Sequence, residues 1–196
     1  MKVENNTILI TGGASGIGLE FARQFAQLGN RVIVTGRNLQ KLENVRKNFP
    51  QIHTFKSDVT LAEDIRILFE QVTQRFPELN ILINNAGIGR ILDLKEQQSA
   101  FSLTEELDTN LRAPIQMINQ FLPQLKQQKD AAIINVSSAL AFVPFPKVPI
   151  YSAAKAGLHS YSLSLRIQLK NTGIKVFEVA PPSTQTDMLD GLTKEI

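Results

Sequence analysis

The feature that most constrains the fold is an alternation of short apolar runs with longer amphipathic segments along the chain. The short runs are mostly apolar and lie at positions 8–10, 32–34, 52–56, 81–83, 133–136 and 174–179. Such runs are typical of strands that are buried on both faces, and the segments between them have the spacing of helices. The pattern predicts an α/β fold in three αβα layers, with a doubly wound parallel sheet and helices on both of its faces.

Two of the longer segments contain local sequence patterns, one for the start of a helix and one for a bend within a helix. Residues 60–63, Thr-Leu-Ala-Glu, have the spacing of a capping box, so we expect Thr60 to cap the helix that follows. A long helix is expected over 103–127, with a bend at Pro114 because proline cannot donate the helical hydrogen bond. No repeat or linker interrupts the 196 residues, so a single domain over 1–196 is predicted.

Composition narrows the chemistry that is open to this fold. The chain has no cysteine, two histidines and two tyrosines. Without cysteine there are no disulfides or thiol nucleophiles, and two distant histidines leave little for a zinc site, so no metal is expected. The net charge of +3 comes from scattered residues, so no nucleic-acid partner is expected. The N-terminus lacks a signal-peptide layout and the sequence contains no membrane span, which favours a cytoplasmic protein.

A glycine-rich turn joins the first apolar run to the first helical segment, with the sequence Thr-Gly-Gly-Ala-Ser-Gly-Ile-Gly at 11–18. Glycines allow a tight bend and let backbone N–H groups approach a phosphate at the N-terminus of the next helix. A turn without a ligand is the alternative. The spacing differs from the standard G-x-G-x-x-G fingerprint and from a Walker loop. The cofactor contacts expected here are Gly12, Ser15, Gly16, Ile17 and Gly18.

This T-G-x3-G-x-G turn resembles that of the classical short-chain dehydrogenase/reductase family, and the resemblance extends over essentially the whole chain. It implies a Rossmann-type fold and hydride transfer between a nicotinamide cofactor and a carbonyl or alcohol. Asp58-Val59 after the third strand and Asn-Asn-Ala-Gly at 84–87 after the fourth are similar to the family's cofactor contacts. Asn85, Ala86 and Gly87 are therefore expected at the cofactor, whereas Asn84 could equally serve only to support the sheet.

The residue that follows the second strand indicates which nicotinamide cofactor is preferred. An Asp or Glu there usually accepts a hydrogen bond from the ribose 2′-hydroxyl of NAD, whereas an arginine suits the 2′-phosphate of NADP. The strand at 32–34 is followed by Thr-Gly-Arg, so the acidic position is empty and Arg37 follows it. We therefore expect a preference for NADP(H) with NAD(H) also open, and a solvated surface arginine is the alternative.

Four side chains match the catalytic pattern of the family. Tyr151 and Lys155 are four residues apart on a predicted helix and share one face, and Ser138 lies thirteen residues before Tyr151. A tyrosine hydroxyl has a pKa of about 10, and a neighbouring ammonium lowers it. The resemblance implies that Ser138 binds the carbonyl oxygen and that Tyr151 exchanges the proton. It also implies that Lys155 lowers the pKa of Tyr151 and binds the nicotinamide ribose, and that Asn110 supports the proton relay.

The chain departs from the family after the sixth strand. Pro181 and Thr186 match residues expected near the nicotinamide, but Pro182 stands where the family usually has glycine, which stiffens this loop. The chain stops at Ile196, so we expect it to lack the rest of the substrate loop and the last strand. The loop at 139–149, together with the Pro-Pro segment, also resembles the oxidoreductases associated with teichoic-acid D-alanylation genes.

The remaining expectations concern the substrate and the partners. A small, apolar carbonyl or alcohol substrate is favoured by the apolar residues between Ser138 and Tyr151, which are Phe142, Val143, Phe145 and Val148. Packing or interface roles are expected for three other residues: His53, His159 and Tyr161. The resemblance implies a homodimer or homotetramer. Two other functions stay open on the same fold, namely an NADP(H)-sensing protein without catalysis and an isomerase or epimerase.

Overall fold

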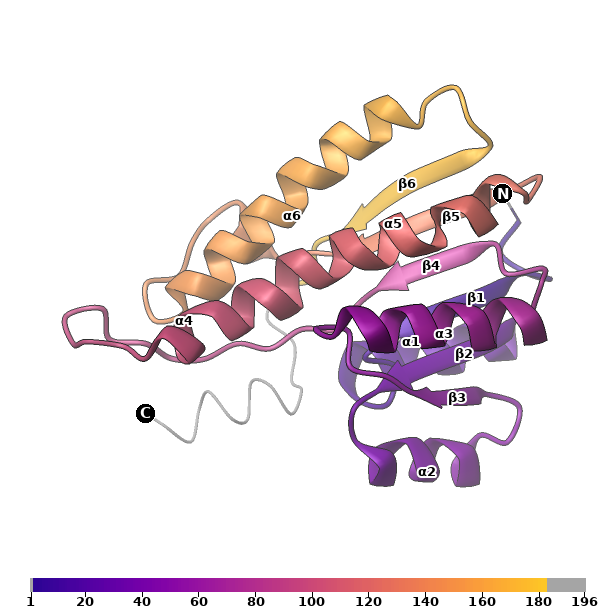
Figure 1. Ribbon diagram of the computed structural model, residues 1–196, viewed down its shortest axis with the longest axis horizontal. Coiled ribbons are helices and arrows are strands. Elements are labelled where there is room, and N and C mark those ends of the chain that lie inside the picture. Colours follow the sequence, from indigo (N-terminus) through magenta and orange to yellow (C-terminus); the bar gives the residue numbers. More distant parts are fainter. Residues whose placement is uncertain (1, 183–196) are drawn as a thin grey trace.

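The computed structural model describes residues 2–182, which form a parallel sheet with helices packed against it (Figure 1). The strand order is β3-β2-β1-β4-β5-β6, and every neighbouring pair is parallel. The strands are β1 (Thr7–Thr11), β2 (Arg31–Gly36), β3 (His53–Lys56), β4 (Ile81–Asn84), β5 (Ala131–Val136) and β6 (Ile174–Val179). The α-helices are α1 (Gly16–Gln27), α2 (Leu39–Asn48), α3 (Ala62–Arg75), α4 (Ala100–Leu107), α5 (Ala113–Lys126) and α6 (Pro149–Gln168). None of these helices, within the residues described, has the length and apolar character that crossing a bilayer requires.

Helices cover both faces of the sheet because successive strand residues point to opposite sides. In β1, Leu9 belongs to the core cluster that includes residues of α3, α5 and α6, whereas Ile8 and Ile10 belong to the cluster that includes residues of α1 and α2. All three side chains are fully buried. The predicted three-layer, doubly wound α/β fold is therefore confirmed. The chain order of the strands reverses at β1, which has β2 on one side and β4 on the other.

The predicted helix over 103–127 begins earlier and is interrupted just before Pro114. α4 ends at Leu107, a π-helical segment η1 (Asp108–Arg112) follows, and α5 begins at Ala113. Pro114 lies in the first turn of α5, and it has no N–H to donate to the carbonyl of Asn110 four residues earlier. The wider π turn accommodates this loss, and it contains the fully buried Asn110.

The predicted capping box is wrong. Leu61, and not Thr60, is the N-cap of α3, and no side-chain hydrogen bond caps this helix. Thr60 instead donates its N–H and its hydroxyl to Asp58 Oδ1, at 2.9 and 2.7 Å. A carboxylate two residues back accepts both donors at once, as aspartate does in tight turns. Asp58, at the edge of the sheet, is thereby held by its own turn.

Candidate active site

The carboxyl ends of the strands open into a cleft of about 1030 Å³. It lies beside β1, where the strand order reverses, and open parallel sheets bind their ligands at such a place. The predicted cofactor residues within 2–182 all line this cleft: Gly12, Ser15, Gly16, Ile17, Gly18, Arg37, Asp58, Val59, Asn85, Ala86, Gly87, Tyr151, Lys155 and Pro181. Ser138 lines it as well. Thr186 lies outside the described residues.

The glycine turn before α1 is braced by the segment that follows β4. Gly12 and Gly16 have positive φ angles of 64° and 54°, which favour glycine. The side-chain amide of Asn85 donates to the carbonyls of Thr11 and Gly12, at 2.9 and 3.2 Å. A Cβ on Gly18 would lie 2.4 Å from that amide nitrogen and 2.6 Å from the Gly12 carbonyl oxygen. The turn therefore excludes a side chain at Gly18 and brings the N-terminus of α1 to the cleft.

Thr11 also holds the turn, although the sequence pattern pointed only to its neighbours. Its hydroxyl accepts the N–H groups of Asn85 and Ala86 at 3.0 and 3.1 Å. The position of Thr11 in the motif, between the strand and the first glycine, is the only sequence signal for this role. Ala86 and Asn85 are thus fixed against β1 as well as lining the cleft.

Asn84 supports the sheet, which was one of its two expected roles. Its side-chain amide donates to Asn135 Oδ1 at 2.9 Å, and Asn135 donates in turn to the hydroxyl of Ser162 at 2.9 Å. All three residues are buried, and they link β4 and β5 to α6. The network fixes the helix that carries Tyr151 and Lys155 against the strand that ends near Ser138.

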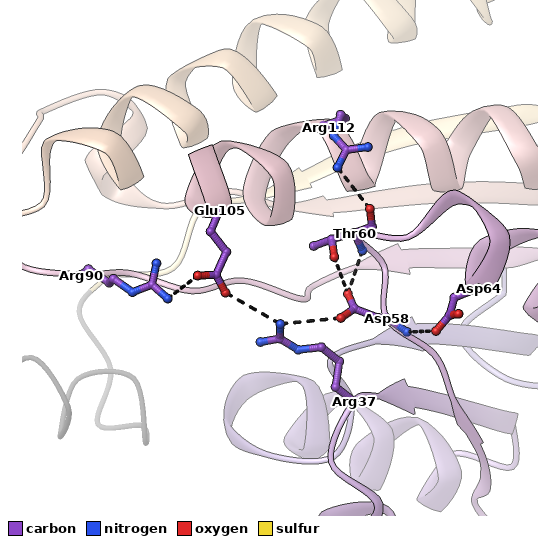
Figure 2. Close-up of polar contacts among 7 residues, drawn as sticks. All are labelled: Arg37, Asp58, Thr60, Asp64, Arg90, Glu105 and Arg112. Carbon is purple, nitrogen blue, oxygen red and sulfur yellow. Dashed lines mark hydrogen bonds and ion pairs between the residues drawn. The ribbon is translucent and has the colours of Figure 1, made fainter. Parts of the chain in front are cut away.

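Arg37, directly after β2, lies between two carboxylates (Figure 2). Its Nη1 is 3.7 Å from Asp58 Oδ2 and 3.8 Å from Glu105 Oε1, and its side chain is 52% exposed. Glu105 comes from α4 and also pairs with Arg90, from the loop after β4. An ion pair this long and this exposed contributes at most about 1 kcal/mol, so the guanidinium can exchange a carboxylate for another anion.

Ser138, Tyr151 and Lys155 come together where the end of β5 meets the start of α6. Ser138 caps the short 3₁₀ helix η2 (Ala139–Ala141), and its hydroxyl accepts the N–H of Leu140 at 3.1 Å. Tyr151 and Lys155 are one turn apart on α6. The buried Lys155 Nζ donates to the carbonyl of Val136 at 2.8 Å and lies 5.6 Å from the centre of the Tyr151 ring.

Burial displaces the pKa of both ionisable groups of this trio. It raises the pKa of Tyr151; the hydrogen bond with Ser138 opposes this, and the nearby Glu106 carboxyl adds to it. It lowers the pKa of Lys155 to about 8. The expectation that Lys155 lowers the pKa of Tyr151 is wrong for the chain by itself, because desolvation dominates and the ammonium is directed to Val136. Tyr151 therefore keeps its proton at neutral pH.

Asn110 lies behind the wall of the cleft. Its Oδ1 accepts the N–H of Ile88 at 3.1 Å, and its Nδ2 donates to the carbonyl of Ile88 at 2.7 Å. A Cβ on Gly87 would lie 2.8 Å from Asn110 Oδ1 and 3.7 Å from Lys155 Nζ. The side chain thus holds the loop after β4 close to Lys155, and its part in a proton relay stays a prediction.

The expected apolar wall is only partly present. Phe145 and Val148 line the cleft, but Phe142 and Val143 are not among its lining residues. Phe142 packs edge-on against the ring of His159, with 4.6 Å between the ring centres, and Val143 is 73% exposed. The prediction is therefore wrong for Phe142 and Val143, because the 3₁₀ turn after Ser138 directs them away from the cleft.

The cleft is also lined by polar and cationic residues that no sequence pattern indicates. Arg90 and Lys147 line it, and so do Thr35 and Ser57. The hydroxyls of Thr35 and Ser57 are buried and have no hydrogen-bond partner among the described residues. These positions follow no motif, because only the packing of loops from different strands brings them to one surface.

The histidines and the second tyrosine take packing roles, as expected. His53 packs against Phe76, with 4.8 Å between the ring centres, and Tyr161 packs against the core cluster. His159 Nδ1 is 2.8 Å from Glu178 Oε2. Within residues 2–182, no three His, Asp or Glu side chains form a group that could hold a metal ion.

Comparisons with known proteins agree with the geometry of this cleft. The family model for short chain dehydrogenases matches residues 6–196. The uncharacterized oxidoreductase DltE of Bacillus subtilis is 43% identical over 189 residues, which cover 96% of this chain and 75% of that protein. The 3-oxoacyl-[acyl-carrier-protein] reductase FabG of Staphylococcus aureus is 32% identical over 196 residues, which cover 96% and 78%. The DltE match supports the resemblance to the oxidoreductases associated with teichoic-acid D-alanylation genes.

Two solved structures with bound cofactors have the same architecture. A 3-ketoacyl-(acyl-carrier-protein) reductase from Brucella melitensis, complexed with NADH, superposes with a TM-score of 0.93 at 27% identity, covering 98% of this chain and 82% of its own. A short chain dehydrogenase from Burkholderia cenocepacia, in complex with NADP, superposes with a TM-score of 0.85 at 28% identity, covering 96% and 76%.

Proposed function

The chain belongs to the short-chain dehydrogenase family of oxidoreductases, and on that premise we propose that it transfers a hydride between NADP(H) and a carbonyl or secondary alcohol, with Tyr151 as the general acid and base. The observation that carries this proposal is the meeting of Ser138, Tyr151 and Lys155 in the cleft that also contains the glycine turn. A proton donor and a dinucleotide cradle are the two parts that such a reaction needs.

The residues of the cleft fit a nicotinamide dinucleotide. The glycine turn presents backbone at the N-terminus of α1, where a pyrophosphate is favoured. The unpartnered hydroxyls of Thr35 and Ser57 supply hydrogen-bonding groups between that turn and the ends of β2 and β3. Lys155 at the opposite end can bind the nicotinamide ribose. When bound, the cofactor supplies the hydride and, in its oxidised form, a positive charge.

The side chains of the catalytic trio have different roles at the substrate oxygen. The Ser138 hydroxyl binds that oxygen and stabilises negative charge on it. The Tyr151 hydroxyl donates its proton during reduction, and the raised pKa keeps this proton in place at neutral pH until it is needed. In the oxidation direction the same hydroxyl must be deprotonated, and the positive charge of the oxidised cofactor would favour that form. Asn110 positions the loop after β4 against Lys155.

The preference for NADP(H) rests on Arg37. The position that carries an acidic residue in NAD-binding relatives of this fold has none here, and the Arg37 guanidinium lies at the cleft with weak ion pairs only. The similar structures bind NADH in one case and NADP in the other, so they favour neither cofactor for this chain. A guanidinium that can leave Glu105 for a 2′-phosphate supports the preference.

The substrate we propose is a small carbonyl compound or secondary alcohol with an apolar part. Phe145 and Val148 form the apolar side of the cleft next to Tyr151, and Arg90 and Lys147 add cationic groups to its rim. An apolar group next to the carbonyl would pack against the first pair, while an anionic group further out could pair with the second.

The proposal is tested by following nicotinamide absorbance with a panel of ketones, aldehydes and secondary alcohols on the full-length protein. Tyr151→Phe removes only the hydroxyl, so kcat should fall by about 10² to 10⁴ while the Kd for NADPH stays the same. Tyr161→Phe is the matched control because Tyr161 packs on the core, away from the cleft. Cofactor binding without turnover of any substrate would indicate the sensor alternative, and substantial turnover by Tyr151→Phe would remove Tyr151 from its role.

A further inference from the structure

Glu106 is a buried carboxyl group near the catalytic trio. It lies on α4, which packs against the Tyr151-bearing helix α6, and its exposed fraction is 0%. Neither of its carboxyl oxygens makes a well-aligned hydrogen bond with any described residue. Burying an ionisable group in this way is costly, and proteins rarely do it outside functional sites.

Three groups face this carboxyl from the elements around it. Arg90, in the loop after β4, supplies two favourable groups. Its backbone N–H and its guanidinium favour the ionised form, although Nη1 of Arg90 is itself buried without a hydrogen bond to a described residue. Glu105, the preceding residue, disfavours that form. On α6 the facing group is Tyr151, whose ionisation Glu106 opposes. In the adjoining π-helical segment, Asp108 and Arg112 pair with each other instead.

We propose that Glu106 is a positioning residue of the active site, a buried carboxyl whose charge keeps the proton on the Tyr151 hydroxyl. The inference rests on the function proposed above and identifies a group beyond the Ser138, Tyr151 and Lys155 trio. The two side chains lie on helices that pack against each other, and burial of Glu106 reduces the screening of its charge by solvent. An ionised Glu106 therefore acts on the ionisation of the Tyr151 hydroxyl.

The direction of the effect follows from the charges. Burial raises the pKa of Glu106 to about 7, so its carboxyl ionises as the pH rises through neutrality. The new negative charge makes phenolate at Tyr151 less favourable and so retains the proton that reduction requires. Glu106 should therefore extend carbonyl reduction to higher pH, whereas it opposes alcohol oxidation.

The experiment uses an advantage of this sequence, which has no tryptophan and only two tyrosines. In a Tyr161→Phe background, Tyr151 is the one tyrosine left, and its phenolate absorbance reports its ionisation directly, without substrate.

Glu106→Gln removes the charge with little change of shape and should move the midpoint of this titration down by about one pH unit. Glu106→Met, which is apolar and of similar length, should do the same even if the buried amide of the glutamine destabilises the fold. Asp108→Asn on the same side of the cleft is the matched control and should leave the midpoint in place, because Asp108 is paired with Arg112.

An unchanged midpoint in both folded Glu106 variants, or an equal shift in Asp108→Asn, would overturn the proposal. A second measurement, the pH profile of kcat/KM for reduction, should show its alkaline limb shifted down in Glu106→Gln by the same amount. The titration needs no turnover, so a protein that shifts its Tyr151 midpoint but reduces no carbonyl would contradict the proposed function and leave the role of Glu106 standing.

Discussion

The two ends of the cleft are built in different ways. The glycine end, made of residues 11–18 with Arg37, is shaped by backbone that leaves no room for a Cβ at Gly18, and its one cationic side chain is half exposed and loosely paired. The catalytic end, made of Ser138, Tyr151 and Lys155, consists of side chains, and burial displaces the pKa values of its tyrosine and lysine. Substitutions should therefore change affinity through shape at the glycine end, and pH dependence through ionisation at the catalytic end.

Two consecutive glutamates on α4 show the same contrast within one turn of helix. Glu105 reaches the glycine end, where Arg37 and Arg90 flank it. Glu106 is fully buried on the same helix, which packs against α6, and its charge opposes the ionisation of Tyr151. Identical side chains thus serve opposite ends of the site, and their surroundings decide which property each one controls.

The largest effect is expected on stability at the catalytic end. Folded Lys155 loses its proton near pH 8, whereas an unfolded lysine does so near its ordinary value of 10.5, so between these values the unfolded chain holds more protons. The free energy of unfolding should therefore rise with pH over this window, by at most about 3 kcal/mol from this group. Lys155→Met has no proton to lose, so it should be more stable than the parent protein at pH 7, and the difference should shrink towards pH 10.

Denaturant unfolding of the two proteins over that pH range measures this difference, and taking the difference removes the titrations they share. Lys175, which lies on an exposed position of β6, is the matched control: Lys175→Met should give a profile parallel to that of the parent protein. Parallel profiles for Lys155→Met as well would mean that Lys155 is buried at no ionisation cost, and the contrast between the two ends would fail.

A smaller effect is expected from shape at the glycine end. The added Cβ of Gly18→Ala would overlap the Gly12 carbonyl oxygen at 2.6 Å and the Asn85 amide at 2.4 Å, so the turn must shift. Cofactor binding should weaken by about tenfold to a hundredfold, or about 1.4 to 2.8 kcal/mol, while the pH profile of kcat keeps its shape.

Isothermal titration with NADPH checks the affinity, and a thermal unfolding curve checks that Gly18→Ala is folded. If Gly18→Ala moved the pH profile and left the affinity unchanged, the two ends would not be separable in the way their construction suggests.

Features that depend on neighbours in sequence could be predicted before the structure was known. Apolar runs indicated the buried strands, and glycine spacing indicated the turn at 11–18. A separation of one helical turn indicated that Tyr151 and Lys155 lie on one face. Each of these is local, because period and turn chemistry act within a few residues. The fold and the positions of the cofactor residues in the cleft followed from them, whereas the roles of these residues stay predictions.

Features decided by competition or by burial could not be predicted. Thr60 had the spacing of a cap, but the carboxylate of Asp58 took its hydrogen-bond donors. The pKa of Tyr151 rises because burial outweighs the hydrogen bond with Ser138, and burial cannot be measured from a sequence. Glu106 had no distinguishing pattern at all, since a glutamate on an amphipathic helix usually faces water.

At the ion pairs of the glycine end, two substitutions should move cofactor preference in opposite directions, and the second of them is the smallest effect expected. Arg37→Asp places a carboxylate beside Asp58 and should lower the ratio of kcat/KM for NADPH over NADH by about tenfold or more, because a charge-assisted contact to the 2′-phosphate contributes about 1.5 to 3 kcal/mol. Glu105→Gln releases Arg37 from an exposed pair and should raise that ratio only a few-fold, since such pairs contribute about 1 kcal/mol or less.

Steady-state kinetics with both cofactors at one ionic strength measure these ratios, and Glu63→Gln, an exposed change of the same charge on α3, serves as the control. Added salt should diminish the Glu105→Gln effect, because exposed pairs are screened. If Glu105→Gln lowered the preference for NADPH, then Glu105 would hold Arg37 in its binding position and not compete for it. An unchanged ratio in Arg37→Asp would make Arg37 a solvated surface residue, and the glycine end would then owe its selectivity to backbone shape alone.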